Sequence, residues 1–116
     1  MDGLLRVEGG KPLRGYINVR GAKNLVPKAM VAALLGDTPS VISNVPHIRD
    51  VEVVSGLLRV HGATVDFDAK AGVLSIDHSA IETASSASIN AHAGSSRIPI
   101  LFCGPLLHRL GRATIP

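Results

Sequence analysis

Apolar residues in the first third of the chain recur at the spacing of a helix. Four of them stand at i, i+4, i+7 and i+8: Val26, Met30, Ala33 and Leu34. This spacing predicts a helix with one buried face. Asn24 is suited to cap its start, and Pro27 falls in the first turn, where a missing N–H costs little. Gly36 follows the last apolar position and is expected to end the helix.

A second helix is predicted from Asp50, whose carboxylate is suited to an N-cap, to Gly62. Its apolar face is formed by three residues at helical spacing: Val51, Val54 and Leu58. Between the two helices, residues 40–45, which include Val41, Ile42 and Val45, are predicted to form a buried strand closed by Pro46.

The next part of the chain changes to a period of two. Residues 64–68 and 73–77 alternate apolar and polar side chains around Ala71-Gly72, which predicts a β-hairpin. Residues 79–96 are rich in Ser and Ala, and we expect either a loop or a short strand at 88–91. A third helix is expected over residues 98–110.

Three short strands are predicted near the two ends of the chain, at residues 4–7, 16–19 and 113–115. The resulting order is strand, helix, strand, helix, hairpin, followed again by strand, helix and strand. Gly111 ends the third helix as Gly36 ends the first, which adds a weak sign of an internal repeat. The pattern therefore indicates an α/β fold built from a repeated unit.

Composition narrows the class of protein. With 46% apolar and 18% charged residues the chain can bury a core and is not a disordered tail. Only 3% of its residues are aromatic, so the net charge of +3 is poor support for nucleic-acid binding. The lone Cys103 excludes an internal disulfide, and neither a signal peptide nor a membrane-spanning run is found, so we expect a cytoplasmic protein.

Positive charge is concentrated at the two ends of the chain. Residues 1–28 carry six Lys and Arg against two acids, and residues 93–116 carry three Arg and no acid. Two predicted helices begin beside one of these cations, Lys23 in one case and Arg97 in the other. Unpaired N–H groups at a helix start attract anions, so a cation there favours an anion-binding site.

Four ordered blocks of sequence resemble one enzyme family: Gly21-Ala22-Lys23-Asn24, Ser43-Asn44-Val45-Pro46-His47-Ile48-Arg49-Asp50-Val51, Leu57-Leu58 with Gly62-Ala63, and Gly104-Pro105-Leu106-Leu107. The family is that of the UDP-N-acetylglucosamine enolpyruvyl transferases, also named 1-carboxyvinyltransferases, and the chain is similar to their N-terminal part. Two stretches depart from the usual family pattern, Leu25-Val26-Pro27-Lys28 and Ser96-Arg97-Ile98-Pro99.

The resemblance implies a fold and a reaction. The fold is a two-domain inside-out α/β barrel, in which residues 1–20 would be strands of the other domain. Residues 21–116 would begin the substrate-binding domain, with one complete βαβαββ-type unit and part of a second. The reaction transfers enolpyruvyl from phosphoenolpyruvate to the 3-hydroxyl of UDP-N-acetylglucosamine and releases phosphate. It is the first committed step of peptidoglycan synthesis, and so belongs to cell-wall biogenesis, cell shape and cell division.

The resemblance also implies the site residues. Lys23 and Asn24 match the family positions that contact phosphoenolpyruvate, and Arg97 matches the arginine on the UDP-N-acetylglucosamine side. No metal or organic cofactor is expected, nor a nucleic-acid or membrane partner, and the oligomeric state is left open. The reactive cysteine is expected in a Gly-Gly-Cys sequence just after Pro116, so the 116 residues alone are expected to be inactive.

The remaining chemical groups suggest no second site. Cys103 has no Lys or Arg three or four residues away to stabilise a thiolate, so we interpret it as a buried, inert thiol. The five histidines, at 47, 61, 78, 92 and 108, lack metal-ligand spacing. We expect His61 at a helix end and the others on the surface.

Two alternatives remain. The sister transferase that acts on shikimate 3-phosphate shares the fold, but it carries a different Asp-Lys-Ser pattern where this chain has Gly-Ala-Lys-Asn. A non-catalytic module that binds nucleotide sugars is the other alternative, and the sequence after Pro116 distinguishes it from the enzyme.

Overall fold

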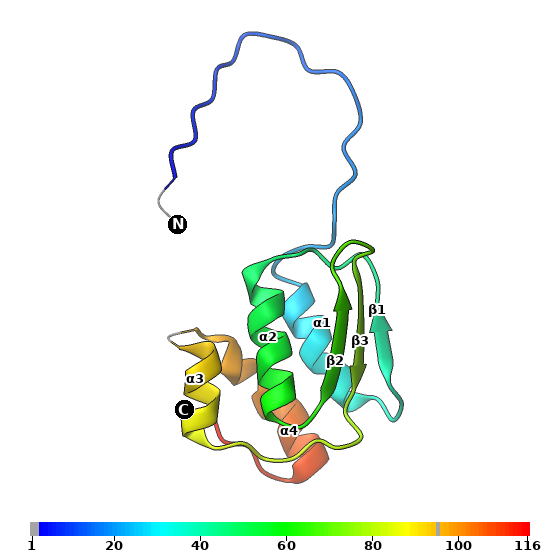
Figure 1. Cartoon of the computed structure of the whole chain (residues 1–116), viewed down its shortest axis with the longest axis vertical. Helices are drawn as coiled ribbons and strands as arrows, with labels where there is room; N and C mark the ends of the chain where they lie inside the picture. The colour runs from blue at the N-terminus through cyan, green and yellow to red at the C-terminus, as the bar shows by residue number, and fades with distance from the viewer. Residues whose placement is uncertain (1–2, 95) are drawn as a thin grey trace.

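The computed structural model describes residues 3–94 and 96–116 (Figure 1). A small sheet forms one side of the folded body, α1 and α2 pack beside it, and α3 and α4 lie beyond them. The elements follow in this order: α1 (Val26–Ala32), the 3₁₀ helix η1 (Ala33–Leu35), β1 (Ser40–Ile42), α2 (Arg49–Val60), β2 (Thr64–Asp68), β3 (Val73–Asp77), α3 (Ser86–Ala93), the 3₁₀ helix η2 (Ile98–Phe102) and α4 (Cys103–Leu110).

The sheet has three strands in the order β1-β3-β2, and both pairs are antiparallel. The predicted hairpin is confirmed with its bounds, and Gly72 in its turn has φ +70°. On the central strand Leu74 and Ile76 are fully buried, whereas Ser75 between them is not. This alternation turns one face of the sheet toward the helices, as the period of two requires.

The core lies between this face and the helices. Eight side chains in it have no exposed surface: Met30, Leu34, Val51, Val54, Leu57, Leu58, Leu74 and Ile76. They come from α1, η1, α2 and β3, so the core joins the first helix, the second helix and the sheet. Phe102 and Leu106 extend the same core into η2 and α4. The buried faces predicted for the first two helices are thereby confirmed.

Two predicted helix caps are wrong. The N-cap of α1 is Leu25 rather than Asn24, because the N–H groups of Leu25 and Val26 both donate to the Ala22 carbonyl and close a turn ahead of the helix. The N-cap of α2 is Ile48, so Asp50 lies inside the first turn. Its negative charge there still stabilises the helix by interacting with the helix dipole. Gly36 does end the first helical segment, in an extended conformation.

Residues 86–93 form a helix, so the loop or strand predicted there is wrong. The Ser85 hydroxyl caps α3 by accepting from the Ser88 N–H at 3.1 Å. Only Ile89 and Ala93 are buried, at i and i+4, on an otherwise exposed helix. The third predicted helix is present as η2 followed by α4, and Gly111 ends it in the left-handed conformation, at φ +70°.

The strands predicted at 4–7, 16–19 and 113–115 are not formed. Residues 3–19 run away from the body as an extended segment (Figure 1), with Leu4 96% and Leu13 96% exposed. A strand needs a neighbour for its N–H and C=O groups, and the described residues give this segment none. The α/β class is confirmed, although the unit lacks its opening strand. The assignment of residues 1–20 to another domain stays a prediction.

Candidate functional site

The three predicted site residues line one cleft, which we name the Lys23–Arg97 cleft. It has a volume of about 550 Å³ and also borders Pro27, Lys28, Asp50, Ile98, Ile100 and Leu101. Lys23 and Asn24 come from the turn before α1, and Arg97 comes from the residue before η2. More than seventy positions apart in sequence, they meet because α1 packs against η2.

The turn that carries Lys23 and Asn24 is fixed by backbone hydrogen bonds. Leu25 and Val26 donate to the Ala22 carbonyl at 3.1 Å each, and the Gly21 N–H donates to the Asn44 carbonyl at 2.8 Å. Both site side chains are exposed, and neither forms a hydrogen bond with another described residue. The turn therefore holds the backbone in place and leaves both polar groups available to a ligand.

Hydrogen bonds also fix the backbone around Arg97. Its carbonyl accepts from the Ile100 N–H at 3.3 Å, and the next N–H, that of Ile98, donates to the Ser96 hydroxyl at 3.2 Å. Pro99 lies in the first turn of η2 and is buried. The guanidinium is exposed at the edge of the cleft, where its paired N–H donors suit phosphate oxygens.

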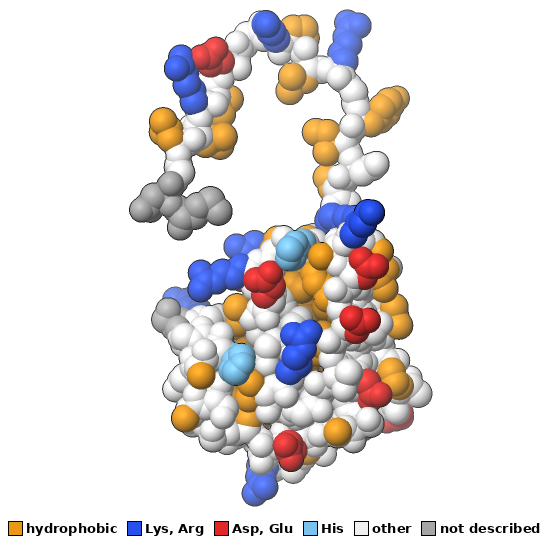
Figure 2. Space-filling view, viewed as in Figure 1, with side chains coloured by type: hydrophobic (Ala, Val, Ile, Leu, Met, Phe, Trp, Pro, Cys, Tyr) orange, Lys and Arg blue, Asp and Glu red, His pale blue; other side chains and the backbone are white. Residues whose placement is uncertain are grey.

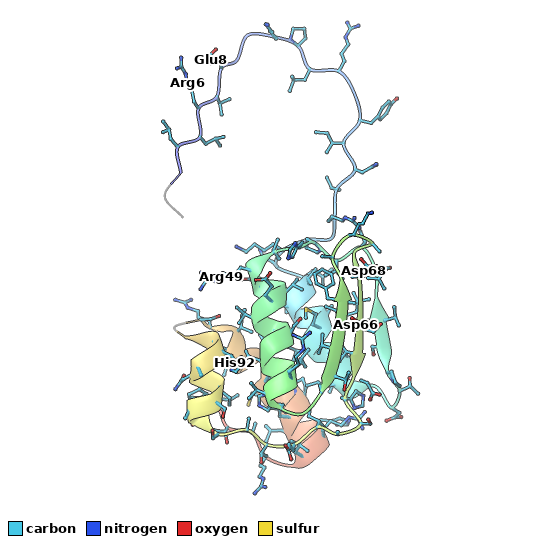
Figure 3. The ribbon with its side chains drawn as sticks, viewed as in Figure 1. Arg6, Glu8, Arg49, Asp66, Asp68 and His92 are labelled. Atoms are coloured by element: carbon cyan, nitrogen blue, oxygen red, sulfur yellow. The ribbon has the colours of Figure 1, made fainter. Side chains whose placement is uncertain are left out.

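A second cleft, the Arg49–His92 cleft, adjoins the first and shares Lys23 and Asp50 with it. Its volume is about 660 Å³, and it lies between the start of α2 and the end of α3. Figure 3 shows Arg49 at the N-terminal end of α2 and His92 on α3. The His92 ring lies against α2 because Gly56 has no side chain, and a Cβ there would be 3.3 Å from the ring.

The charged residues around the two clefts are mainly cationic. Lys23, Lys28, Arg49 and Arg97 face them, against the single acid Asp50. Lys and Arg side chains gather along the upper left edge of the folded body in Figure 2. Cations grouped at a concave surface raise the local concentration of anions, so the site suits a ligand with several negative groups.

Sequence reasoning missed Arg49 and His92 as cleft residues. Arg49 is the first residue of α2, and so carries the same signal, a cation beside a helix start, that singled out Lys23 and Arg97. The position of His92 depends on the packing of α3 against Gly56, and nothing local in the sequence indicates it.

The other candidate groups lie elsewhere. Cys103 is half-buried in the first turn of α4 and borders neither cleft. His61 closes α2 as expected, with its ring stacked on Phe102 at 5.3 Å. His78 is buried, so its expected place on the surface is wrong. Among residues 3–94 and 96–116, no three metal-ligating side chains come together.

The pKa of the Asp77 carboxyl group is lowered by its neighbours in a turn. The backbone N–H and the side chain of Ser79 donate to the exposed Asp77 carboxylate and lower its pKa, and neighbouring His78 adds a smaller effect. Asp77 ends β3 and borders neither cleft, so this shift belongs to a turn. No helix in this part of the chain is long and apolar enough to cross a membrane.

The chain is similar to known enzymes over most of its length. The sequence profile of EPSP synthase (3-phosphoshikimate 1-carboxyvinyltransferase) matches residues 7–115. The UDP-N-acetylglucosamine 1-carboxyvinyltransferase of Protochlamydia amoebophila is 41% identical over 106 residues, which cover 91% of this chain and 22% of that protein. The enzyme of the same name from Chloroherpeton thalassium is 42% identical over 113 residues, covering 96% of this chain and 25% of that protein.

The fold is shared with a solved enolpyruvyl transferase. The crystal structure of the enolpyruvyl transferase NikO from Streptomyces tendae aligns with a TM-score of 0.70 at 24% identity, over 89% of this chain and 23% of that one. The chain thus spans about a quarter of the length of the proteins it matches. Since the family profile covers nearly every residue, the chain belongs to the EPSP synthase (3-phosphoshikimate 1-carboxyvinyltransferase) family, and the sequence resemblance to the UDP-N-acetylglucosamine 1-carboxyvinyltransferases is confirmed.

Proposed function

We propose that the gene product containing this chain transfers enolpyruvyl from phosphoenolpyruvate to the 3-hydroxyl of UDP-N-acetylglucosamine, with release of phosphate. The reaction would be the first committed step of peptidoglycan precursor synthesis, carried out in the cytoplasm. The observation that carries the proposal is the meeting of Lys23, Asn24 and Arg97 at one cationic cleft. Both proposed substrates are polyanions, which is the class of ligand that such a cleft attracts.

Each residue has a role that suits its chemistry. The compact ammonium of Lys23 would bind a phosphate or carboxylate oxygen of phosphoenolpyruvate. The Asn24 amide can donate to an oxyanion and accept from a hydroxyl, and it adds no negative charge beside the substrate. Arg97 would bind the diphosphate of the nucleotide sugar through two parallel N–H donors.

The charge distribution fits the course of the reaction. Enolpyruvyl transfer passes through a tetrahedral intermediate, in which charge is redistributed between the two substrates as phosphate leaves. Cations already in place around the cleft would stabilise that charge without having to reorganise during the reaction. The reactive cysteine is proposed to follow Pro116, a residue that borders a third cleft, of about 310 Å³, together with Arg97.

Two observations favour UDP-N-acetylglucosamine over shikimate 3-phosphate as the acceptor. The relatives from Protochlamydia and Chloroherpeton carry the name of the nucleotide-sugar enzyme, although the family profile is named after the shikimate enzyme. The turn at the cleft reads Gly21-Ala22-Lys23-Asn24, which resembles the UDP-N-acetylglucosamine enolpyruvyl transferases rather than the shikimate 3-phosphate enzyme.

The test is phosphate release by the full-length gene product, with phosphoenolpyruvate and either acceptor. We expect release with UDP-N-acetylglucosamine and none with shikimate 3-phosphate. Lys23→Ala should lower kcat/KM by roughly 10²- to 10³-fold, since it removes a cation from the reacting centre. The matched control is Lys70→Ala, an exposed lysine in the hairpin turn that borders neither cleft. Equal kinetics of the two variants would refute the role of Lys23.

A further inference from the structure

Arg20 marks the place where the exposed segment 3–19 joins the folded body. Its guanidinium donates from Nη1 to the Ala71 carbonyl and from Nη2 to the Lys70 carbonyl, each at 3.2 Å. Both acceptors lie in the turn between β2 and β3, where the segment reaches the body in Figure 1. A single side chain thus spans two adjacent carbonyls of a turn about fifty positions away in sequence.

Backbone hydrogen bonds surround this contact. The Gly21 N–H donates to the Asn44 carbonyl at 2.8 Å, and the Val45 N–H donates to the Gly72 carbonyl at 2.9 Å. Residues 20–21, 44–45 and 70–72 are therefore cross-linked to one another, and we name this group the Arg20 anchor.

Two glycines make the anchor sterically possible. A Cβ on Gly21 would lie 2.8 Å from the Asn44 carbonyl oxygen, too close for any real side chain. A Cβ on Gly72 would overlap the Arg20 guanidinium and lie 3.1 Å from the Val45 carbonyl oxygen. A larger residue at either position would clash with a neighbouring group of the anchor, so both positions need glycine.

The anchor directly precedes the turn that presents Lys23 and Asn24. Ala22, whose carbonyl closes that turn, follows Gly21 in the chain. The segment on the other side of Arg20 has its apolar side chains almost fully exposed, for example Tyr16 and Ile17. Without the Arg20 side chain, the Gly21–Asn44 hydrogen bond would remain to restrain the start of the Lys23 turn where this segment joins it.

We propose that Arg20 is a positioning residue, which holds the Lys23–Asn24 turn against the β2–β3 turn at the point where residues 3–19 join the folded body. Its role in substrate binding rests on the proposed function, whereas its role in holding the turn does not. The planar guanidinium matches two carbonyls at once, and the single ammonium of a lysine would match them less well.

The first test is hydrogen exchange in the full-length gene product. In Arg20→Ala the amides of Gly21, Leu25 and Val26 should exchange roughly three- to tenfold faster, because local opening of their hydrogen bonds becomes easier. Arg20→Lys should give an intermediate rate. The matched control is Arg59→Ala, which removes another guanidinium-to-carbonyl bond of the hairpin, 2.8 Å from Arg59 Nη2 to the Val65 carbonyl oxygen.

The second test uses steady-state kinetics of the same variants. Arg20→Ala should raise the KM for phosphoenolpyruvate roughly three- to tenfold with a smaller change in kcat, and Arg20→Lys should restore part of it. The Arg59→Ala control should leave that KM unchanged. Faster exchange without any transfer activity in the wild type would refute the proposed function and leave the anchor standing. Exchange rates and KM equal to those of the control would overturn the anchor itself.

Gly72→Ala provides an independent check, because the added Cβ should displace the Arg20 guanidinium. It should speed exchange of the Gly21 amide in the wild-type background and have a smaller effect in Arg20→Ala. Gly72 has φ +70°, so alanine there is also strained, but the strain is present in both backgrounds and cancels in the double-mutant cycle. Fully additive effects would contradict the proposed contact.

Discussion

Arg109 in α4 provides the sharpest stability prediction. Its Nε donates to the Leu34 carbonyl at 2.6 Å and its Nη2 donates to the Gly36 carbonyl, at the C-terminal end of the α1–η1 segment. Nη2 also lies 3.3 Å from Asp37 Oδ1, and the Arg109 side chain is only 23% exposed. A cation that donates to terminal carbonyls stabilises a helix end both by hydrogen bonding and through the helix dipole.

The expected loss in Arg109→Ala follows from these contacts. Hydrogen bonds to a charged group contribute about 1.5–3 kcal/mol each, and we count the part-buried Leu34 bond near the low end and the exposed Gly36 bond for little. The Asp37 carboxylate is 97% exposed, so that ion pair adds only about 0–1 kcal/mol. The variant should lose about 2 kcal/mol of unfolding free energy.

Urea denaturation followed by far-ultraviolet circular dichroism measures this loss. Arg112→Ala is the matched control, an exposed arginine just after α4, and it should change the free energy by less than about 0.5 kcal/mol. Asp37→Asn, which removes the ion pair and keeps both carbonyl bonds, should also have a small effect. The reasoning fails if Arg109→Ala matches Arg112→Ala, or if Asp37→Asn alone reproduces the whole loss.

Three further predictions concern the site. Arg49→Gln should weaken binding of UDP-N-acetylglucosamine to the full-length gene product roughly three- to tenfold in calorimetry, whereas Arg112→Gln should not; equal affinities would remove Arg49 from the site. Cys103→Ala should leave turnover nearly unchanged, because the thiol borders neither cleft, and lost turnover at unchanged Tm would refute this. With both substrates present, the 116 residues alone should release no phosphate from phosphoenolpyruvate above a Lys23→Ala background, since the proposed reactive cysteine would lie outside them.

Elements whose signals are local could be predicted from the sequence. The hairpin is specified by a period of two on both sides of Ala71-Gly72, and the structure has the expected bounds. The buried faces of α1 and α2 follow from apolar spacing, which packing against the sheet then preserves. In each case the residues that form the pattern pack against other residues of the same folded body.

Elements that depend on distant groups could not be predicted as well. Helix α3 buries only Ile89 and Ala93, so its helical period is hidden among Ser and Ala. The expected cap at Asn24 was overridden by the Ala22 carbonyl, a backbone acceptor that no residue type reveals. Strands at residues 4–7 and 16–19 have the right composition but no hydrogen-bonding neighbour in the described residues.

The candidate site shows the same division. A cation near a helix start is a local signal that indicates Lys23 and Arg97. Arg49, at the start of α2, carries the same signal. The position of His92 could not be predicted, because it depends on the space that Gly56 leaves for the imidazole ring. Local chemistry thus indicates which side chains can bind an anion, whereas packing decides which of them share a cleft.

The clefts depend on contacts that lie outside them. Arg109 fixes α4, and with it the adjoining η2 beside Arg97, to the end of the α1–η1 segment. At the other end of α1, the Arg20 anchor holds the Lys23 turn to the hairpin. Lys23 and Arg97 meet where α1 packs against η2, and we expect these two arginines, which border neither of the two clefts, to support that packing from the two ends of the α1–η1 segment. Loss of either one should alter the relative placement of the two cations before it unfolds the core, because both contacts lie at the edge of the packed region rather than within it.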